Sequence, residues 1–343
     1  MRVLVIGGTG FIGPPVVRLL AGAGHEVAVF HRGEHEPPLP AGVRHVHSPS
    51  AAMPVLSFPA DLAADRPDVV LHMTPLGARD ARAAVDAFAG RAGRVVALSS
   101  CDVYAAYGRL IRLEDGPPDH APLAEDAPLR SRLFPYRAAA SGPDDWTHDY
   151  EKILAERVFL EAPDLPATVL RLPAVYGPGD PQRRLHPWLR RMVDARPAIL
   201  LAEEAARWRW SHGYVQNVAE AIARAVTGGA SADRVYNVAD DPAPELAAWV
   251  GRIGEAAGWR GRIATVPRAE LPAHLQDPYD YRHPLVVDSS RIRRELGWSG
   301  GTSLADALRA TVEADLAAGL APADPARFDY AAEDDALRRI GAV

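Results

Sequence analysis

The sequence has little cysteine: Cys101 is the only one among 343 residues. A single cysteine cannot form a disulfide within the chain, and it cannot supply the several thiolates of a zinc or iron–sulfur cluster. We therefore predict neither a disulfide framework nor a metal site.

The sequence also lacks a long apolar run and an excess of basic residues. No stretch approaches the roughly 20 apolar residues that a membrane-spanning helix needs. The formal net charge is −6, which gives no basic field for nucleic acid. The N-terminal apolar run has no basic leader and no small-residue cleavage site after it. These absences predict a cytoplasmic protein whose partner is a small molecule rather than a nucleic acid or a membrane.

Lysine is equally scarce: Lys152 is the only lysine among the 38 Lys and Arg residues. The chain uses arginine at every other basic position, so a solvated surface charge is a weak explanation for this one. We expect Lys152 to be retained for the compact shape and the donors of its ammonium group.

The chain is longer than one compact core, which stops growing at roughly 250–300 residues. Residues 1–180 are predicted to form a first domain, interrupted by a Pro- and Asp-rich excursion at 109–145 of the kind that forms lids. Residues 181–320 are assigned mainly to a smaller C-terminal substrate-binding lobe. Two further segments complete the division: residues 214–240 return to the first domain, and residues 321–343 form a surface tail.

Apolar runs alternate with helical patterns in the first domain, which predicts an α/β fold with a doubly wound parallel sheet of the Rossmann type. The predicted strands are residues 2–6, 25–30, 69–73, 94–98, 167–172 and 235–238. The predicted helices include residues 78–89, 149–160 and 218–226.

A glycine-rich loop, GGTGFIG, joins the first strand to the first helix with GxxGxxG spacing. Glycine permits the tight turn, lets a pyrophosphate approach the backbone and lets helix and strand pack closely. The phosphates then lie at the positive end of the helix. The alternative is a tight turn with no ligand. The candidate cofactor-binding residues are Gly7, Thr9, Gly10, Phe11, Ile12 and Gly13.

The end of the second strand bears on the choice of cofactor. A carboxylate there binds the ribose 2′-hydroxyl of NAD, whereas an arginine suits the 2′-phosphate of NADP. The sequence has Phe30, His31, Arg32 and Gly33 at this point, with no carboxylate. We predict that Arg32, together with His31, binds a 2′-phosphate, so that NADP is preferred to NAD. A solvated turn arginine is the alternative.

Several further motifs follow the glycine loop in a fixed order. Together the ordered set resembles the extended short-chain dehydrogenase/reductase family, the NAD-dependent epimerases and dehydratases, over about residues 1–315. The resemblance implies a nicotinamide cofactor, a homodimer, and contacts of Met73 and Pro173 with the cofactor. The motifs are GGTGFIG, VVLHM, LSSCDVY, YEKILAER, RLPAVYGPGD, VYNV and ELGW.

In the LSSCDVY segment, the resemblance implies that Ser100 is the catalytic serine. Its hydroxyl would form a hydrogen bond with the substrate oxygen that gains or loses a proton. A capping serine at a strand end is the alternative. Dehydratases of the family have two acids next, and here Cys101 stands at the first position and Asp102 at the second. The incomplete pair argues against ordinary sugar dehydration. Tyr104 is the segment's candidate substrate-binding residue.

The resemblance makes Lys152 the lysine that holds the nicotinamide ribose and lowers the pKa of a tyrosine four residues earlier. His148, not tyrosine, stands at that position. Tyr150 is only two residues before Lys152, about 200° around an α-helix. Three interpretations stay open: Tyr150 turns inward because the helix begins at or after it, His148 acts as the acid/base, or proton transfer has been lost.

The segment Arg207–Tyr214 lies where the resemblance implies an arginine on a substrate phosphate. Arg209 is the candidate, one position away from the expected register. A strand with alternating tryptophans and arginines, packed on one face, is the equal alternative.

These patterns predict an NAD(P)-dependent epimerase, dehydratase or reductase that acts on a polar hydroxyl or carbonyl compound, such as a nucleotide-linked sugar, by hydride transfer. The alternative function is a non-catalytic NADP-binding sensor or regulatory protein of the same fold, which the altered tyrosine position would suit. An RNA-binding relative is disfavoured by the acidic charge.

Overall fold

Short aliphatic runs form a seven-stranded sheet in the computed structural model, which describes residues 1–119, 122–228 and 234–341. Residues 120–121 of the predicted excursion, 229–233 of the returning segment and 342–343 of the predicted tail lie outside the described residues. Among the described residues, no helix combines the length and the apolarity needed to cross a membrane.

The sheet is parallel throughout and follows the order β10-β6-β5-β4-β1-β2-β3. The order reverses between β1 and β4, and in such sheets ligands bind in the crevice outside the carboxyl ends of the strands at this point. The predicted Rossmann fold is therefore confirmed. The strands are β1 (Arg2–Ile6), β2 (Glu26–His31), β3 (Arg44–His47), β4 (Val69–His72), β5 (Val95–Ser100), β6 (Ala167–Leu172) and β10 (Arg234–Asn237).

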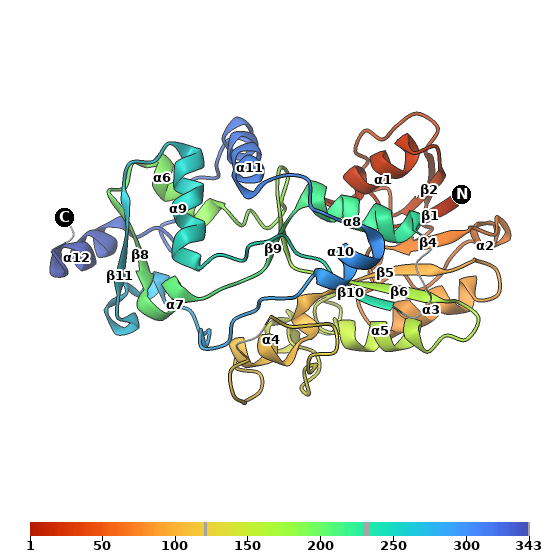
Figure 1. Cartoon of the computed structure of the whole chain (residues 1–343), viewed down its shortest axis with the longest axis horizontal. Helices are drawn as coiled ribbons and strands as arrows, with labels where there is room; N and C mark the ends of the chain where they lie inside the picture. Colours follow the sequence, from red (N-terminus) through yellow and green to blue (C-terminus); the bar gives the residue numbers. More distant parts are fainter. Residues whose placement is uncertain (120–121, 229–233, 342–343) are drawn as a thin grey trace.

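Helices cover both faces of the sheet, because the strand side chains are apolar on both faces (Figure 1). Val3 and Val5 of β1 pack in the cluster that holds α1 and α8, whereas Leu4 and Ile6 pack in the cluster that holds α3 and α5. On the first face lie α1 (Gly13–Gly22), α8 (Val215–Thr227) and α10 (Ser290–Leu296). On the second face lie α2 (Ala60–Ala64), α3 (Ala78–Phe88) and α5 (Lys152–Leu160).

A smaller lobe stands beside the carboxyl end of the sheet and contains a parallel two-stranded sheet, β8–β11. The short parallel pair β7–β9 links it to the nucleotide domain. The N-terminus lies in the nucleotide domain and the C-terminus in the lobe (Figure 1). The elements of this half are β7 (Ala174–Tyr176), α6 (His186–Val193), β8 (Ala198–Ala202), α7 (Glu203–Arg207), β9 (His212–Tyr214), α9 (Leu246–Ala257), β11 (Arg262–Val266), α11 (Leu304–Ala318) and α12 (Tyr330–Arg339).

Residues 321–343, which we expected to form a surface tail, contain α12, and this helix packs on the lobe. Leu337 is fully buried, and Glu333 is 1% exposed. Glu333 accepts a 2.6 Å hydrogen bond from the Arg191 guanidinium of α6. The apolar face and the buried ion pair make α12 part of the lobe, although its sequence is rich in charge.

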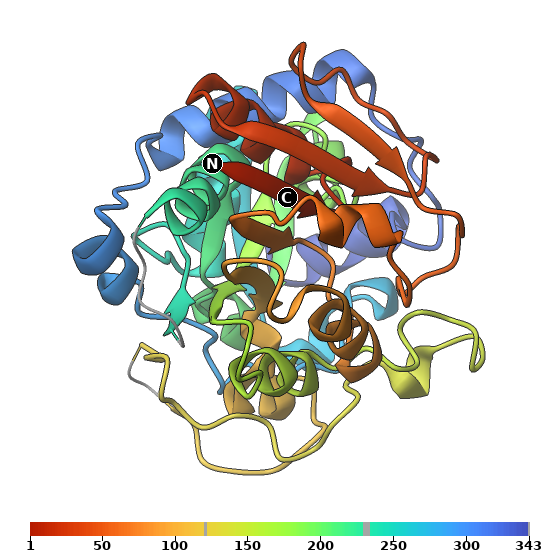
Figure 2. The same cartoon turned by 90° about the vertical axis from the view of Figure 1, so that its right-hand side faces the viewer.

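The excursion at 109–145 is anchored at several points. Leu129 pairs with Tyr104 and Leu123 pairs with Val287 in isolated bridges. Arg130 reaches Glu151, just before α5, in an ion pair whose two side chains are both 0% exposed. In the view turned by 90°, the excursion runs as yellow coil along the lower part of the molecule (Figure 2). Its described residues are therefore held to the nucleotide domain by buried polar contacts.

Candidate active site

The glycine loop has the geometry that a dinucleotide pyrophosphate requires. Gly7 has φ +84°, a conformation that favours glycine. A Cβ on Gly13 would lie 2.3 Å from the Gly8 carbonyl oxygen, so only glycine lets the start of α1 pack against the loop. A Cβ on Gly10 would meet nothing within 4 Å, which leaves that face of the loop open to a ligand. The residues present therefore fit a dinucleotide.

The other predicted cofactor residues gather near this loop. Thr9 lies within it, and Phe11, Ile12 and Met73 are partly buried against the core beside it. The Met73 backbone N–H donates a 3.0 Å hydrogen bond to the carbonyl oxygen of Ile6, the last residue of β1. Met73 is thus fixed at the point where the strand order reverses.

The end of β2 presents a basic group. His31 is 5% exposed, and its Nε2 lies 2.9 Å from Nδ1 of His45 on β3. The Arg32 guanidinium lies 2.9 Å from the Glu34 carboxylate, and its side chain is 34% exposed. Because exposed ion pairs contribute only about 0–1 kcal/mol, Arg32 can exchange this partner for a ligand.

A cavity of about 880 Å³ opens between the carboxyl end of the sheet and the lobe. It brings together Ser100, the last residue of β5, and Asp102, which follows the strand, with Tyr150, which precedes α5. Pro173 lines the same cavity. Three of the predicted catalytic residues therefore meet at the edge where α/β sheets bind ligands.

Tyr150 is the centre of the hydrogen bonding at this end of the cavity. It is 8% exposed, and its hydroxyl donates a 2.9 Å hydrogen bond to Asp102 Oδ2. The hydroxyl also contacts the Ser100 side chain. Burial and the nearby Asp102 carboxylate raise the pKa of Tyr150 well above its ordinary value, and burial also raises the pKa of Asp102. Tyr150 is consequently held in its protonated form at neutral pH.

Tyr150 turns inward because α5 begins at Lys152, three residues later than we predicted. The Glu151 side chain accepts a 3.0 Å hydrogen bond from the Ile153 N–H and so caps the helix. The helical rotation that would place Tyr150 opposite Lys152 therefore does not apply. His148 lies outside the cavity lining and contacts the exposed Asp149 carboxylate at 2.9 Å.

Lys152 is buried next to this group. Its ammonium donates hydrogen bonds to the carbonyl oxygens of Pro75, at 2.6 Å, and Leu98, at 3.2 Å. It lies 5.5 Å from the centre of the Tyr150 ring. Burial lowers the pKa of Lys152 to about 8, although the Asp102, Asp80 and Glu156 carboxylates act in the opposite direction.

Two predicted substrate-binding residues do not reach the cavity. Tyr104 is 0% exposed, and its hydroxyl donates a 2.7 Å hydrogen bond to Asn237 Oδ1 and accepts one from Arg171 at 3.0 Å. Arg209 donates from Nε to the Ala243 carbonyl oxygen and lines a separate hollow with Arg207. Side chains alternate along an extended segment, so the tryptophans beside Arg209 take the cavity side.

The sequence analysis missed Tyr136, which lies in the excursion and lines the cavity. Its hydroxyl donates a 3.0 Å hydrogen bond to Asp102 Oδ2 and lies 2.9 Å from the Tyr107 hydroxyl. No spacing relates it to Ser100 or Tyr150, so no sequence pattern reveals it. The sequence analysis also treated Trp208 and Trp210 only as packing residues, although both line the cavity. The alternation of tryptophan and arginine along this segment was the signal that could have placed them on one side.

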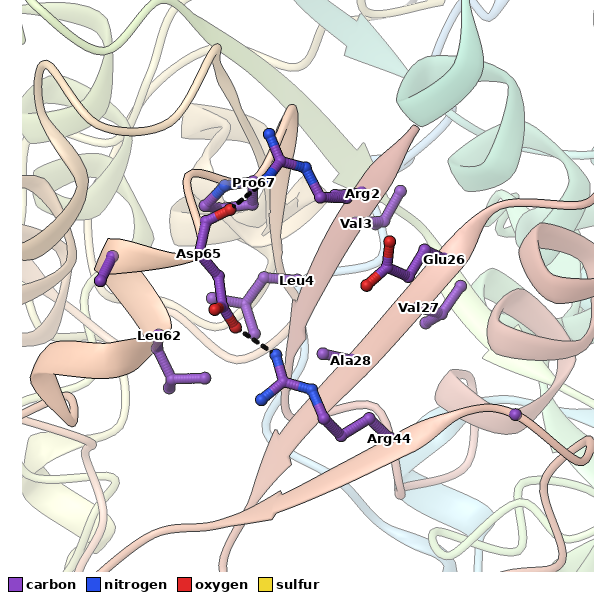
Figure 3. A pocket seen from close by; sticks show the side chains of 12 residues that line it. Arg2, Val3, Leu4, Glu26, Val27, Ala28, Arg44, Leu62, Asp65 and Pro67 are labelled. Atoms are coloured by element: carbon purple, nitrogen blue, oxygen red, sulfur yellow. Dashed lines mark hydrogen bonds and ion pairs between the residues drawn. The ribbon is translucent and has the colours of Figure 1, made fainter.

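A second hollow, of about 620 Å³, lies at the opposite edge of the sheet, where β1 and β2 begin (Figure 3). Both of its arginines are engaged within the protein: Arg44 pairs with Asp65, and Arg2 donates to the Asp65 carbonyl oxygen at 2.6 Å. We therefore assign the chemistry to the cavity at the carboxyl edge.

The parallel sheet, the glycine loop and the cavity at this edge define a dinucleotide-binding Rossmann fold. More specifically, the chain belongs to the NAD-dependent epimerase/dehydratase family, whose sequence model matches residues 3–239. It is 33% identical over 223 residues to 2′-dehydrokanamycin reductase of Streptomyces kanamyceticus, covering 62% of this chain and 54% of that protein. It is 29% identical over 197 residues to dTDP-glucose 4,6-dehydratase of Streptomyces griseus, and this match covers 57% of this chain and 53% of that protein. The matches span about half the length of these curated relatives.

Solved structures share the fold. UDP-glucuronic acid 4-epimerase of Bacillus cereus, in complex with UDP-glucuronic acid and NAD, superposes with a TM-score of 0.66 at 17% identity. The match covers 93% of this chain and all of that one.

Proposed function

We propose that the protein is a nicotinamide-dependent reductase that converts a ketone to an alcohol on a polar ring compound, and that Tyr150 supplies the proton. The observation that carries the proposal is the meeting of Tyr150, Ser100 and Asp102 in one cavity at the carboxyl edge of the sheet. A bound nicotinamide would supply the hydride. Thr9, Gly10 and the start of α1 would hold its pyrophosphate, and Lys152 its ribose.

The hydrogen-bond chain supports proton donation. As the carbonyl carbon gains a hydride, its oxygen becomes an alkoxide and takes the proton of the Tyr150 hydroxyl, oriented by Ser100. The phenolate that remains can recover a proton along the chain of Asp102, Tyr136 and Tyr107, whose links are 2.9, 3.0 and 2.9 Å long. The raised pKa of Asp102 suits a carboxyl group that carries a proton in passing.

The residue at the first acid position favours reduction over dehydration. Cys101 is 3% exposed, and burial raises the pKa of its thiol. A thiol whose pKa is raised by burial gives up its proton far less readily than a carboxylic acid, so Cys101 is a poor general acid for the elimination of water. The inward position of Tyr150 likewise removes the main support for a non-catalytic sensor, because that alternative depended on a missing tyrosine.

The first test is dinucleotide binding. We expect the purified protein to bind NADPH more tightly than NADH, because the end of β2 offers Arg32 and no carboxylate. We expect Arg32→Ala to weaken NADPH binding by about tenfold, one charge-assisted contact, and to leave NADH binding unchanged. Fluorescence titration measures both affinities, and mass spectrometry of the denatured protein identifies any retained nucleotide.

Each outcome of that test is informative. Failure to bind either dinucleotide contradicts the proposed function. Equal affinities that Arg32→Ala does not change contradict only the preference for NADP. A tightly retained oxidised nucleotide contradicts the reductase direction and supports an epimerase or dehydratase, which regenerates its cofactor in each turnover.

The affinity for the dinucleotide is expected to fall as the pH rises above about 8. Burial lowers the pKa of Lys152 to about 8, so its ammonium loses the proton above that pH. An ammonium that donates to ribose hydroxyls binds better than the neutral amine, so binding weakens up to tenfold per pH unit. Titrations between pH 7 and 10 measure the effect. Lys152→Arg, which stays charged, should show a flat profile, and an equally steep fall in that variant would contradict the assignment.

A further inference from the structure

The lobe side of the cavity is built from aromatic rings. Trp208 and Trp210 lie with ring centres 5.4 Å apart, and Trp210 lies 5.4 Å from His212. The His212 ring stacks on Trp249 at 3.9 Å with an angle of 7° between the planes. The lining on this side includes Trp188, Trp208, Trp210, His212, Trp249 and Tyr281. Such a surface binds the flat face of a ring.

The cavity offers little to a phosphate. Among the described residues that line it, Arg184 is the only arginine or lysine, and Asp102 and Asp145 are also present. Nη1 of Arg184 is bound to Asp180 Oδ1 at 2.8 Å and to the Val175 carbonyl oxygen at 2.7 Å, so this single cation is partly satisfied within the protein. Recognition of a diphosphate normally uses arginines or lysines whose donors face the ligand.

His212 cannot replace the missing cation. Burial lowers the pKa of His212 to about 3, so its ring is neutral at physiological pH. Arg207 and Arg209, which the sequence places beside the cavity tryptophans, line a separate hollow with Arg282. These arginines therefore face a hollow other than the cavity that Trp210 lines.

We propose that the substrate is a neutral or cationic ring compound without a phosphate group, held by stacking on Trp210, rather than a nucleotide-linked sugar. The inference rests on the proposed function, because it names the substrate class of the same cavity. Two kinds of molecule share the required chemistry: a glycoside that presents the C–H face of its sugar ring, and an aromatic or polycyclic ketone or alcohol.

The test compares the affinities of defined probes for the full-length protein, with and without saturating NADP⁺. The phosphorylated probes are UDP and UDP-glucose, with uridine as their unphosphorylated reference. The ring probes are neamine, a cationic aminoglycoside, and 2-naphthol, an aromatic alcohol. Quenching of tryptophan fluorescence and calorimetry report binding without requiring turnover.

We expect UDP to bind within threefold of uridine, and at least one ring probe to bind tenfold or more tighter than UDP-glucose. Tighter binding of neamine would indicate that the substrate is a glycoside. Tighter binding of 2-naphthol would indicate an aromatic or polycyclic substrate. Trp210→Ala should weaken the better ring probe by about tenfold, whereas Trp210→Phe should retain it within about threefold. Arg209→Ala is the matched control and should change no affinity.

Three results would overturn the inference: UDP binding tenfold or more tighter than uridine, a loss of UDP-glucose binding in Arg209→Ala, or ring probes that bind no better than UDP-glucose. Any of these with intact dinucleotide binding leaves the proposed function in place. Absence of dinucleotide binding contradicts the proposed function instead. Circular dichroism and thermal unfolding establish that each variant is folded, and Trp210→Phe keeps the comparison valid where Trp210→Ala does not fold.

Discussion

Replacing Tyr150 by phenylalanine is expected to lower kcat by about 10²- to 10³-fold while leaving the dinucleotide affinity unchanged. The substitution removes only the hydroxyl that donates to Asp102 at 2.9 Å and contacts Ser100. General acid catalysis contributes typically 10²- to 10⁴-fold, and the phenylalanine ring preserves the packing. The measurement is the rate of reduced-cofactor consumption with the best substrate from the ring-compound series.

His148→Ala is the matched control for this prediction. His148 stands four residues before Lys152, where the resemblance places its tyrosine, yet its side chain lies outside the cavity and pairs with Asp149. We expect the variant to retain activity within about threefold. An active Tyr150→Phe enzyme together with an inactive His148→Ala enzyme would reverse the assignment of the acid.

Replacing Glu151 by alanine is expected to destabilise the protein by about 3–5 kcal/mol, because it leaves the Arg130 charge buried without its partner. Arg130 and Glu151 are both 0% exposed and lie 2.9 Å apart. Glu151 also accepts hydrogen bonds from the backbone N–H groups of Phe134, at 2.6 Å, and Ile153, at 3.0 Å. Denaturant unfolding measures the loss of free energy.

Two variants sharpen that prediction. Arg309→Ala breaks an exposed ion pair with Asp306, both side chains 58% exposed, and is expected to change stability by no more than about 1 kcal/mol. The double variant Arg130→Met/Glu151→Leu removes both buried charges and should recover part of the loss. A Glu151→Ala protein as stable as the wild type would show that the pair does not anchor the excursion.

This pair connects stability with catalysis. Arg130 belongs to the excursion, and Glu151 caps α5 directly after Tyr150. The same excursion supplies Tyr136, which shares Asp102 Oδ2 with Tyr150. We therefore expect loss of the pair to displace both tyrosines from the Asp102 carboxylate.

The sequence by itself determined the sheet and its glycine loop. Strands such as Arg2–Ile6 and Val95–Ser100 are aliphatic on both faces, and that pattern needs no distant partner to be recognised. The glycines of the loop follow from local backbone conformation and close packing, both set by neighbouring residues. Lys152 was identifiable from composition alone, since it breaks a uniform use of arginine. Strand β3 was missed because its sequence, RHVH, is polar and mostly exposed.

Only the tertiary structure decided which tyrosine lines the cavity and that the tryptophans, rather than the arginines, of residues 207–210 do so. The start of α5 at Lys152 depends on Glu151, whose partner Arg130 lies 21 residues earlier in the chain. Tyr104 lies in a buried hydrogen-bond network with Arg171 of β6 and Asn237 of β10. Such contacts join residues far apart in sequence, and local spacing carries no record of them. The chain therefore specified its cofactor fold locally, whereas the shape and the charge of its substrate cavity arose from long-range packing.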